Sequence, residues 1–249
     1  MVFLFSPAKQ MRAYHLQSSL NLKFKKESFF LMKELKKWSV EKIMTQMKLS
    51  VQKAEETHQI ISAWGKQSNK INGAPAIFSY IGEAYKSLDA ANLQQHELQY
   101  LQERLIILSA LYGALNPMDG VQPYRLEMAQ SGLLTKGTSL YSFWKKPLNV
   151  YMHKYLKSNQ KIVNLASSEY SNVIVDSSLN ERMITPSFLE NKNGQLKTIS
   201  VFSKQGRGAM LKWCAQQQIH ETEEIKKFDL LGYRFNAEIS SDTSWCFTR

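Results

Sequence analysis

Cysteine is scarce in this sequence, and the two present, Cys214 and Cys246, show no spacing typical of a disulfide framework or a zinc site. The five histidines share no ligand spacing either, so we expect no metal site and no cofactor. No apolar run approaches the about 20 residues that a membrane helix needs, and the apolar residues 1–5 are too few for a signal peptide core. These absences predict a cytoplasmic protein that has no membrane partner.

Proline and glycine are also sparse, with 6 and 11 residues that are scattered along the chain. No linker, repeat or low-complexity tract divides the 249 residues. Hydrophobic residues make up 43% of the chain, which is enough for one large core or two modest ones. We therefore expect a single compact domain over residues 1–249.

Acidic residues are in deficit, because 21 Asp and Glu face 32 Lys and Arg and leave a net charge of +11. The excess is concentrated in residues 1–53, which hold eleven basic and three acidic side chains. A localised basic segment is typical of proteins that bind a polyanion such as DNA. Composition alone is equally compatible with a lysine-rich surface that serves only solubility.

Short apolar runs predict three buried strands, at Val2–Phe5, 105–108 and 161–165, although the second run is short enough to be the apolar end of a helix. Helical patterns lie between and after them, at 94–104, 140–156 with a kink or restart at Pro147, and 206–218. An Asn-Gly turn flanked by 182–189 and 196–202 predicts a hairpin. This alternation predicts a mixed α/β protein with a mixed sheet flanked by helices.

Residues 39–64 predict two short helices joined by a tight turn, with Ser39 and Ser50 as their N-caps. Such a helix-hairpin-helix-like element can direct backbone N–H groups at a phosphate of DNA. An ordinary helical hairpin that packs on the core is equally compatible, because the turn lacks the glycine usual in the DNA-binding motif. The candidate DNA contacts in this element are Lys42, Lys48, Ser50 and Lys53.

Ser6 and Lys9 match the S-x-x-K pattern of Ser/Lys acyl-transfer enzymes, but neither the S-D-N nor the K-T-G partner motif occurs elsewhere. Pro7 favours the first position of a helix, so Ser6 is more simply explained as an N-cap and Lys9 as a cation of the first turn. Because the segment follows the first strand, we expect it to cradle an oxyanion or phosphate at the carboxyl edge of the sheet.

Residues 122–128 alternate polar with apolar side chains and predict an amphipathic strand. Arg125 and Glu127 would share one face of that strand. They would either pair with each other or place a guanidinium beside a carboxylate in a cleft.

Two further segments place polar groups beside predicted elements. Residues 164–170 leave the third strand and enter a short helix at the edge where α/β sheets bind ligands, unless Ser167 or Ser168 acts only as a helix cap. Residues 204–208 combine two cations with a G-x-G sequence before a predicted helix. They predict a weak anion site, although a plain turn into the helix is the simpler interpretation.

Several of these segments occur together in a fixed order: FSPAK at 5–9, LSALYG at 108–113, QPYRLEM at 122–128, LYSFW at 140–144, NLASSEY at 164–170 and KQGRG at 204–208. In this set the chain resembles the YaaA family of bacterial peroxide-stress proteins along its whole length. The resemblance implies a role in limiting free iron during hydrogen peroxide stress, and a helix-hairpin-helix element beside a positive cleft that binds DNA. The cleft residues that it implies are Ser6, Lys9, Tyr124, Arg125, Glu127, Asn164, Glu169, Tyr170, Lys204 and Arg207.

Ser168 departs from the family pattern, which has Asp before the Glu-Tyr pair, and this weakens any paired-acid mechanism or iron ligation there. Our leading hypothesis is a DNA-binding protein of the peroxide stress response that contacts duplex phosphates with little sequence preference. The alternative is an enzyme acting on a nucleotide or nucleic-acid base, with Lys9, Arg125 and Glu169 as cation and general acid/base groups.

Overall fold

The strands of the central sheet form where the sequence places its short apolar runs. The computed structural model describes residues 1–12, 18–19, 22–65, 72–174 and 176–249. The strands are β1 (Val2–Phe5), β2 (Gln10–Met11), β3 (Ser18–Ser19), β4 (Asn72–Pro75), β5 (Tyr80–Ile81), β6 (Leu105–Ser109), β7 (Gly113–Leu115), β8 (Gly120–Val121), β9 (Ile162–Leu165), β10 (Met183–Lys192), β11 (Gln195–Lys197), β12 (Arg234–Asn236) and β13 (Ser244–Thr248).

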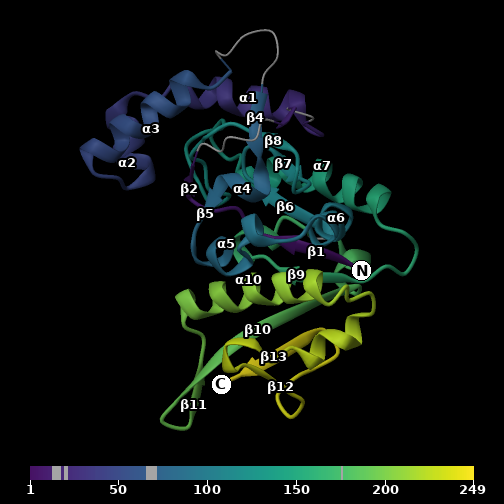
Figure 1. The fold of residues 1–249 in the computed structure, drawn as a ribbon. Helices are drawn as coiled ribbons and strands as arrows, with labels where there is room; N and C mark the ends of the chain where they lie inside the picture. Colours follow the sequence, from purple (N-terminus) through teal and green to yellow (C-terminus); the bar gives the residue numbers. More distant parts are fainter. Residues whose placement is uncertain (13–17, 20–21, 66–71, 175) are drawn as a thin grey trace.

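Helices flank this sheet and complete a mixed α/β fold (Figure 1). The helices are α1 (Lys25–Leu35), α2 (Val40–Met47), α3 (Val51–Ala63), α4 (Ala76–Ser79), α5 (Glu83–Leu88), α6 (Gln95–Arg104), α7 (Leu140–Tyr155), α8 (Ser168–Ser171), α9 (Ser177–Asn180) and α10 (Ser200–Gln216), with 3-10 turns η1 (Ala90–Asn92), η2 (Thr222–Lys227) and η3 (Leu230–Gly232). The predicted fold class is confirmed. Within the described residues, no helix is long and apolar enough to cross a membrane.

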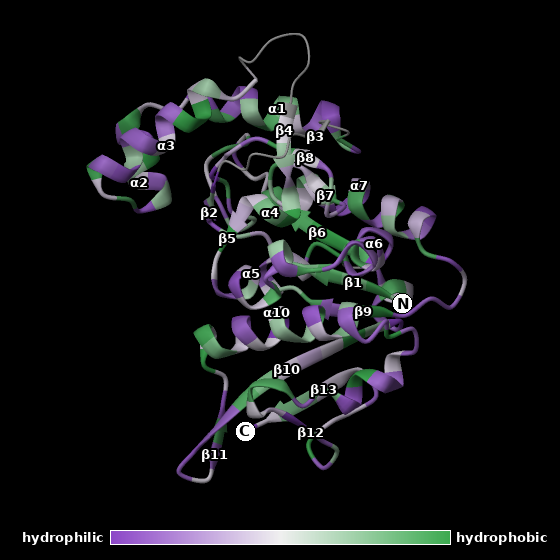
Figure 2. Ribbon diagram, in the orientation of Figure 1, coloured by the Kyte–Doolittle hydropathy of each residue, from purple (hydrophilic) through white to green (hydrophobic). Residues whose placement is uncertain are grey.

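The main sheet has the strand order β12-β13-β10-β9-β1-β6-β7, with β11 paired to β10. β1 lies between β9 and β6 and is parallel to both, and β10 continues the parallel arrangement beyond β9. All four side chains of β1 are buried because helices and loops cover both faces, as in most parallel sheets. Figure 2 shows β1 and β6 among the most hydrophobic parts of the molecule.

The connections that leave β1 and β9 run in opposite directions across the sheet. From β1 the chain goes on to β6 on one side, whereas from β9 it goes through α8 and α9 to β10 on the other. Parallel α/β sheets bind ligands at such a switch point, in the crevice outside the carboxyl ends of the two strands. A ligand site is therefore expected beside the loops that follow β1 and β9.

The C-terminal third differs from the sequence prediction in where its helix begins. We predicted a strand at 196–202 and a helix from residue 206, but β11 ends at Lys197 and α10 begins at Ser200. The two glycines of the 204–208 segment therefore lie inside α10, and the predicted loop before a helix is wrong. A Cβ on Gly208 would lie 1.9 Å from the Ala84 carbonyl oxygen, so this glycine lets α10 pack closely against α5.

Residues 122–128 form no strand, which corrects a second prediction. β8 ends at Val121, and the segment that follows is irregular. Pro123 has no N–H to donate to a sheet, and the backbone of Gln122 bonds to a side chain instead. The Tyr112 hydroxyl donates to the Gln122 carbonyl and accepts from its N–H, at 3.2 and 3.1 Å.

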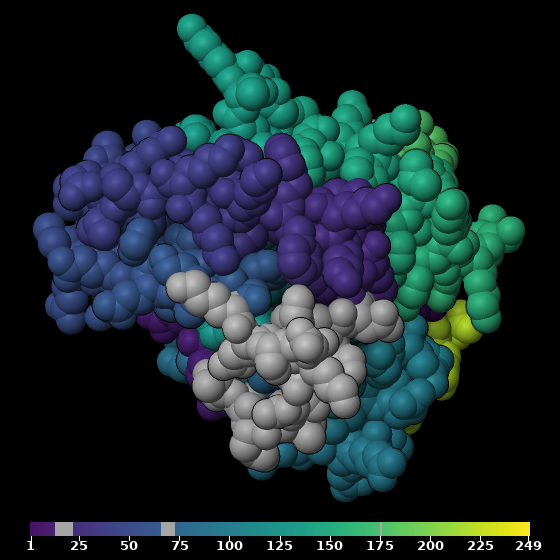
Figure 3. Space-filling model, turned by 90° about the horizontal axis from the view of Figure 1, so that it is seen from above, coloured from purple at the N-terminus to yellow at the C-terminus, as the bar shows by residue number. Residues whose placement is uncertain are grey.

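The helical hairpin predicted at 39–64 is present as α2 and α3. The Ser39 hydroxyl accepts from the backbone N–H of Lys42, and the Ser50 hydroxyl accepts from that of Lys53. Lys48 adopts a left-handed conformation with φ of 51° at the turn, where a glycine is usual. The hairpin projects beyond the body of the molecule (Figures 1 and 3).

The remaining predicted elements are confirmed with shifted ends. The three predicted buried strands correspond to β1, β6 and β9, and the predicted helix at 94–104 corresponds to α6. α7 continues from Leu140 to Tyr155 with Pro147 inside it, so no second helix starts there.

Candidate functional site

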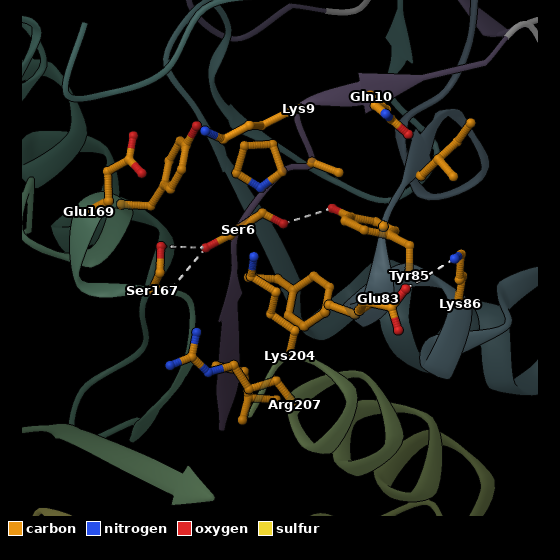
Figure 4. A pocket seen from close by; sticks show the side chains of 18 of the residues that line it. Ser6, Lys9, Gln10, Glu83, Tyr85, Lys86, Ser167, Glu169, Lys204 and Arg207 are labelled. Atoms are coloured by element: carbon orange, nitrogen blue, oxygen red, sulfur yellow. Dashed lines mark hydrogen bonds and ion pairs between the residues drawn. The ribbon is translucent and has the colours of Figure 1, made fainter. Parts of the chain in front are cut away.

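A cavity of about 480 Å³ opens at the switch point between the loops that follow β1 and β9. The N-terminal part of α5 and the middle of α10 form its other walls (Figure 4). Its polar and charged lining residues are Ser6, Lys9, Gln10, Glu83, Tyr85, Lys86, Glu127, Ser167, Glu169, Tyr170, Lys204 and Arg207. The cavity thus has the size and placement of a small-ligand site.

Ser6 and Ser167 join the two strand ends at the base of this site. The Ser167 N–H donates to Ser6 Oγ at 2.8 Å, and the two hydroxyl oxygens lie 3.2 Å apart. The Tyr85 hydroxyl of α5 donates to the Ser6 carbonyl at 2.9 Å. No helix begins at Pro7, so the N-cap role predicted for Ser6 is wrong. Ser167 stands at the N-cap position of α8 but makes no side-chain cap.

The acidic side chains of the site are engaged with neighbours. Glu127 pairs with Lys9 at 2.7 Å, and not with Arg125 as one prediction proposed. Glu169 Oε1 accepts from the backbone N–H of Ala129 at 3.3 Å.

Glu83 is held as a carboxylate by two partners. Gln205 Nε2 donates to it at 2.8 Å, and Lys86 pairs with it at 3.0 Å. The hydrogen bond from Gln205 and then that from Lys86 lower the pKa of Glu83 below its ordinary value. With four cations and three carboxylates around it, the cavity is only weakly positive.

Arg207 and Lys204 are the cations of the site that form no ion pair with a described residue, and Arg207 is the more buried of the two. It is half-buried, its Nε is buried without a hydrogen-bond partner, and no ion pair joins it to another described residue. Burial lowers the pKa of its guanidinium, because removal from water disfavours the charged form. Figure 4 shows the side chain extending from α10 toward the loop that carries Ser167. An anion in the cavity would supply the missing partner.

The tyrosines near the site are neutral hydrogen-bonding groups. Burial raises the pKa of Tyr85 and of Tyr170 well above the ordinary value, so both keep their protons. Tyr124 is fully buried behind the site, and burial raises its pKa to about 12. Its hydroxyl bonds to Ser109 Oγ at 2.8 Å and to the Tyr80 hydroxyl at 3.0 Å. Tyr124 is thus a core residue and not the cleft residue that the resemblance implied.

The structure brings together most of the predicted cleft residues but not all of them. Ser6, Lys9, Glu127, Glu169, Tyr170, Lys204 and Arg207 line the one cavity. Arg125 does not line it, although its Nε is also buried without a partner. Asn164 lines a neighbouring cavity.

The residues of α5 are functional candidates that the sequence did not indicate. Glu83 and Lys86 reach the cavity because Gly208 lets α10 lie against the backbone of α5. That close approach depends on a contact between residues more than a hundred positions apart. The only signal for it was the G-x-G pair, which we interpreted as a loop.

The hairpin residues lie apart from the cavity. Lys42, Lys48, Ser50 and Lys53 are exposed, and Lys42 Nζ lies 5.0 Å above the Trp38 ring. Over α2 and α3 the three lysines are balanced by Glu41, Glu55 and Glu56. The basic excess counted over residues 1–53 is therefore centred on α1 and its flanks, not on the hairpin.

The described residues contain no group of three or more His, Cys, Asp or Glu side chains placed to hold a metal ion. Cys214 and Cys246 are both buried free thiols.

Comparison with known proteins identifies the family. The sequence model of the family described as peroxide stress protein YaaA matches residues 1–239. The chain belongs to the YaaA family. The resemblance inferred from the sequence motifs is therefore confirmed.

Relatives within this family match the chain over its full length. A UPF0246 protein of Legionella pneumophila strain Corby is 38% identical over 255 residues, which cover 100% of this chain and 99% of the relative. A UPF0246 protein of Marinomonas sp. strain MWYL1 is 36% identical over 252 residues, covering 100% and 97%. One from Francisella philomiragia is 34% identical over 255 residues, covering 100% of both chains. These names say nothing of mechanism.

Proposed function

We propose that this YaaA-family protein serves the peroxide stress response by binding DNA through its phosphates, and thereby limits the damage that free iron and peroxide do to DNA. The family description supplies the link to peroxide stress. The main support for DNA binding is Arg207, because its guanidinium lies in the cavity at the switch point and has no protein partner among the described residues.

A phosphate is the anion that best fits Arg207. A buried cation without a partner is costly, and a planar guanidinium can bond two phosphate oxygens at once. Lys204 lies one helical turn before Arg207 on α10 and lines the same cavity. A carboxylate of the protein could serve the same purpose, but the three in the cavity are already engaged by Lys9, Gln205 with Lys86, and the Ala129 N–H.

The hairpin supports a wider DNA contact because it lies on the same side of the molecule as the cavity. β1 begins at the labelled N-terminus and its carboxyl end points toward α5, β2 and β5, and α2 and α3 project on that same side (Figure 1). Gln130 Nε2 donates to the Gln46 carbonyl of α2 at 3.1 Å, close along the chain to the Ala129 N–H that holds Glu169. Lys48 and Lys53 are exposed, and their side-chain ammonium groups form no hydrogen bond or ion pair with the described residues.

Replacement of Arg207 tests the proposal directly. We expect Arg207→Gln to weaken binding of a fluorescent duplex about 10- to 100-fold, because a charge-assisted hydrogen bond contributes about 1.5–3 kcal/mol. Arg234→Gln is the matched control, because Arg234 is exposed on β12 and away from the cavity. Equal affinity of both variants and the wild type would refute the role of Arg207.

An enzyme acting on a nucleotide or nucleic-acid base is a second candidate, because Glu169 and Glu127 lie in the same cavity as the cations. Of the predicted catalytic set, Lys9 and Glu169 line the cavity and Arg125 does not. In this case Glu169→Gln should abolish conversion of an oligonucleotide or nucleotide, followed by chromatography and mass, while affinity is retained. If wild-type protein leaves these substrates unchanged, the enzymatic alternative fails.

A further inference from the structure

A second cavity of about 490 Å³ lies at the carboxyl end of β9 and the amino end of β10. Arg207 lines both cavities, so one guanidinium stands between them. The polar lining of the second cavity consists of Asn164, Ser168, Ser171, Asn172, Asn180, Thr185 and Arg207. No carboxylate and no aromatic side chain belongs to this lining, as far as the chain is described.

Two of the three asparagines in this cavity have side chains available for a ligand. Asn164 is buried and already bonded, since its Nδ2 donates to Thr185 Oγ1 at 3.3 Å and its Oδ1 accepts from Ala166 N–H at 3.1 Å. Asn172 and Asn180 are exposed, and their side-chain amides make no hydrogen bond to the described residues. An amide that offers a donor and an acceptor side by side is suited to the polar edge of a nucleobase.

We propose that the second cavity binds the base of a nucleotide whose phosphate lies on Arg207. The inference rests on the proposed function, since it takes Arg207 to be a phosphate contact. It adds the class of ligand: a nucleotide with an unpaired base, either free or turned out of a strand. A cavity of about 490 Å³ has room for such a unit but not for paired strands.

The chemistry of the two cavities assigns the base to the second one. The first cavity holds three carboxylates that would repel further phosphates, and two of them are paired with Lys9 and Lys86. The second offers uncharged amides and hydroxyls next to the same guanidinium. A nucleotide has the matching arrangement, because its neutral, polar base can contact the amides and hydroxyls while its anionic phosphate contacts the guanidinium.

The test compares three ligands by calorimetry with the full chain: deoxyadenosine 5′-phosphate, deoxyribose 5-phosphate, which lacks the base, and a short single-stranded oligonucleotide. We expect the nucleotide to bind roughly tenfold or more tightly than the sugar phosphate, as one well-placed amide contact to a base provides. The Asn172→Ala/Asn180→Ala double variant should remove that difference and leave the sugar phosphate unaffected. Gln216→Ala, an exposed amide on α10 that lines neither cavity, is the control.

Each other outcome has one meaning. If nucleotide and sugar phosphate bind equally, or if the double variant keeps the difference, the base is not held in the second cavity and the inference is wrong. In both cases the proposed function stands when Arg207→Gln still weakens the oligonucleotide. If Arg207→Gln changes the binding of none of the three ligands, the proposed function fails as well. Binding of the free nucleotide but not of the oligonucleotide would identify the nucleotide as the ligand.

Discussion

Single residues in this protein show how burial separates structural from ligand-binding groups. Tyr124 and Arg207 were both cleft candidates implied by the family resemblance, yet their surroundings differ. The Tyr124 hydroxyl has two protein partners, whereas the buried Nε of Arg207 has none. A buried polar group with full hydrogen bonding stabilises the fold, and one without a partner that also lines a cavity is a candidate for contact with a ligand. The sequence held no information on this difference, because it depends on residues brought close only by folding.

Tyr124→Phe should therefore destabilise the protein rather than weaken ligand binding. The loss of the hydroxyl leaves Ser109 and Tyr80 without a shared partner in the core, which should cost about 1–3 kcal/mol in the free energy of unfolding. Urea denaturation measures this cost. Tyr141→Phe is the control, because the Tyr141 hydroxyl has no hydrogen bond in the described structure and the expected change is below about 0.5 kcal/mol. Equal stability of the two variants would contradict the assignment.

Asp176 gives a pH-dependent prediction at the same scale. Hydrogen bonds from Ser178 and then from His153 lower the pKa of its carboxyl group to about 2. Because this pKa is lower in the folded than in the unfolded state, the interactions stabilise the fold above the ordinary carboxyl pKa and are lost as pH falls toward 2. A carboxyl ¹³C titration by NMR should show a midpoint near 2 that rises in Ser178→Ala. An ordinary midpoint in the wild type would disprove this hydrogen bonding.

At the scale of elements, the sequence predicted those whose formation depends on local patterns. β1, β6 and β9 follow from continuous apolar runs, and α2 and α3 follow from an apolar stripe with serine caps. Residues 122–128 and the start of α10 were predicted wrongly because distant contacts decide them. The hydroxyl of Tyr112 takes the place of a strand partner in the first case, and packing against α5 explains the glycines in the second.

Gly208 is the residue on which the packing of α10 against α5 most depends. A Cβ at this position would overlap the Ala84 backbone, which cannot move as a flexible side chain can. We expect Gly208→Ala to lower the free energy of unfolding by about 1–3 kcal/mol and to weaken DNA binding by shifting Lys204 and Arg207. Val201→Ala, at an exposed position of the same helix, should change both by little. Wild-type thermal and chemical stability of Gly208→Ala would contradict the close packing.

At the scale of the whole molecule, net charge indicates the binding site less well than the topology of the sheet does. Of the basic side chains before residue 54, Lys23 pairs with Asp119, Lys36 donates to the Trp64 carbonyl and Lys37 pairs with Glu34. The formal charge of +11 thus overstates the free positive surface. The topology is more informative, because the switch point between β1 and β9 places residues from five segments around one cavity.

Salt dependence of DNA affinity tests the central claim, that Arg207 and the exposed hairpin lysines neutralise phosphates. The logarithm of the association constant for a short duplex should fall linearly with the logarithm of salt concentration. Arg207→Gln should make this slope shallower by about 0.9, and Lys48→Gln with Lys53→Gln by about 1.8, because each phosphate contact releases about one counterion. A wild-type affinity that is unchanged between low and moderate salt, or slopes that are identical in all three proteins, would contradict the account.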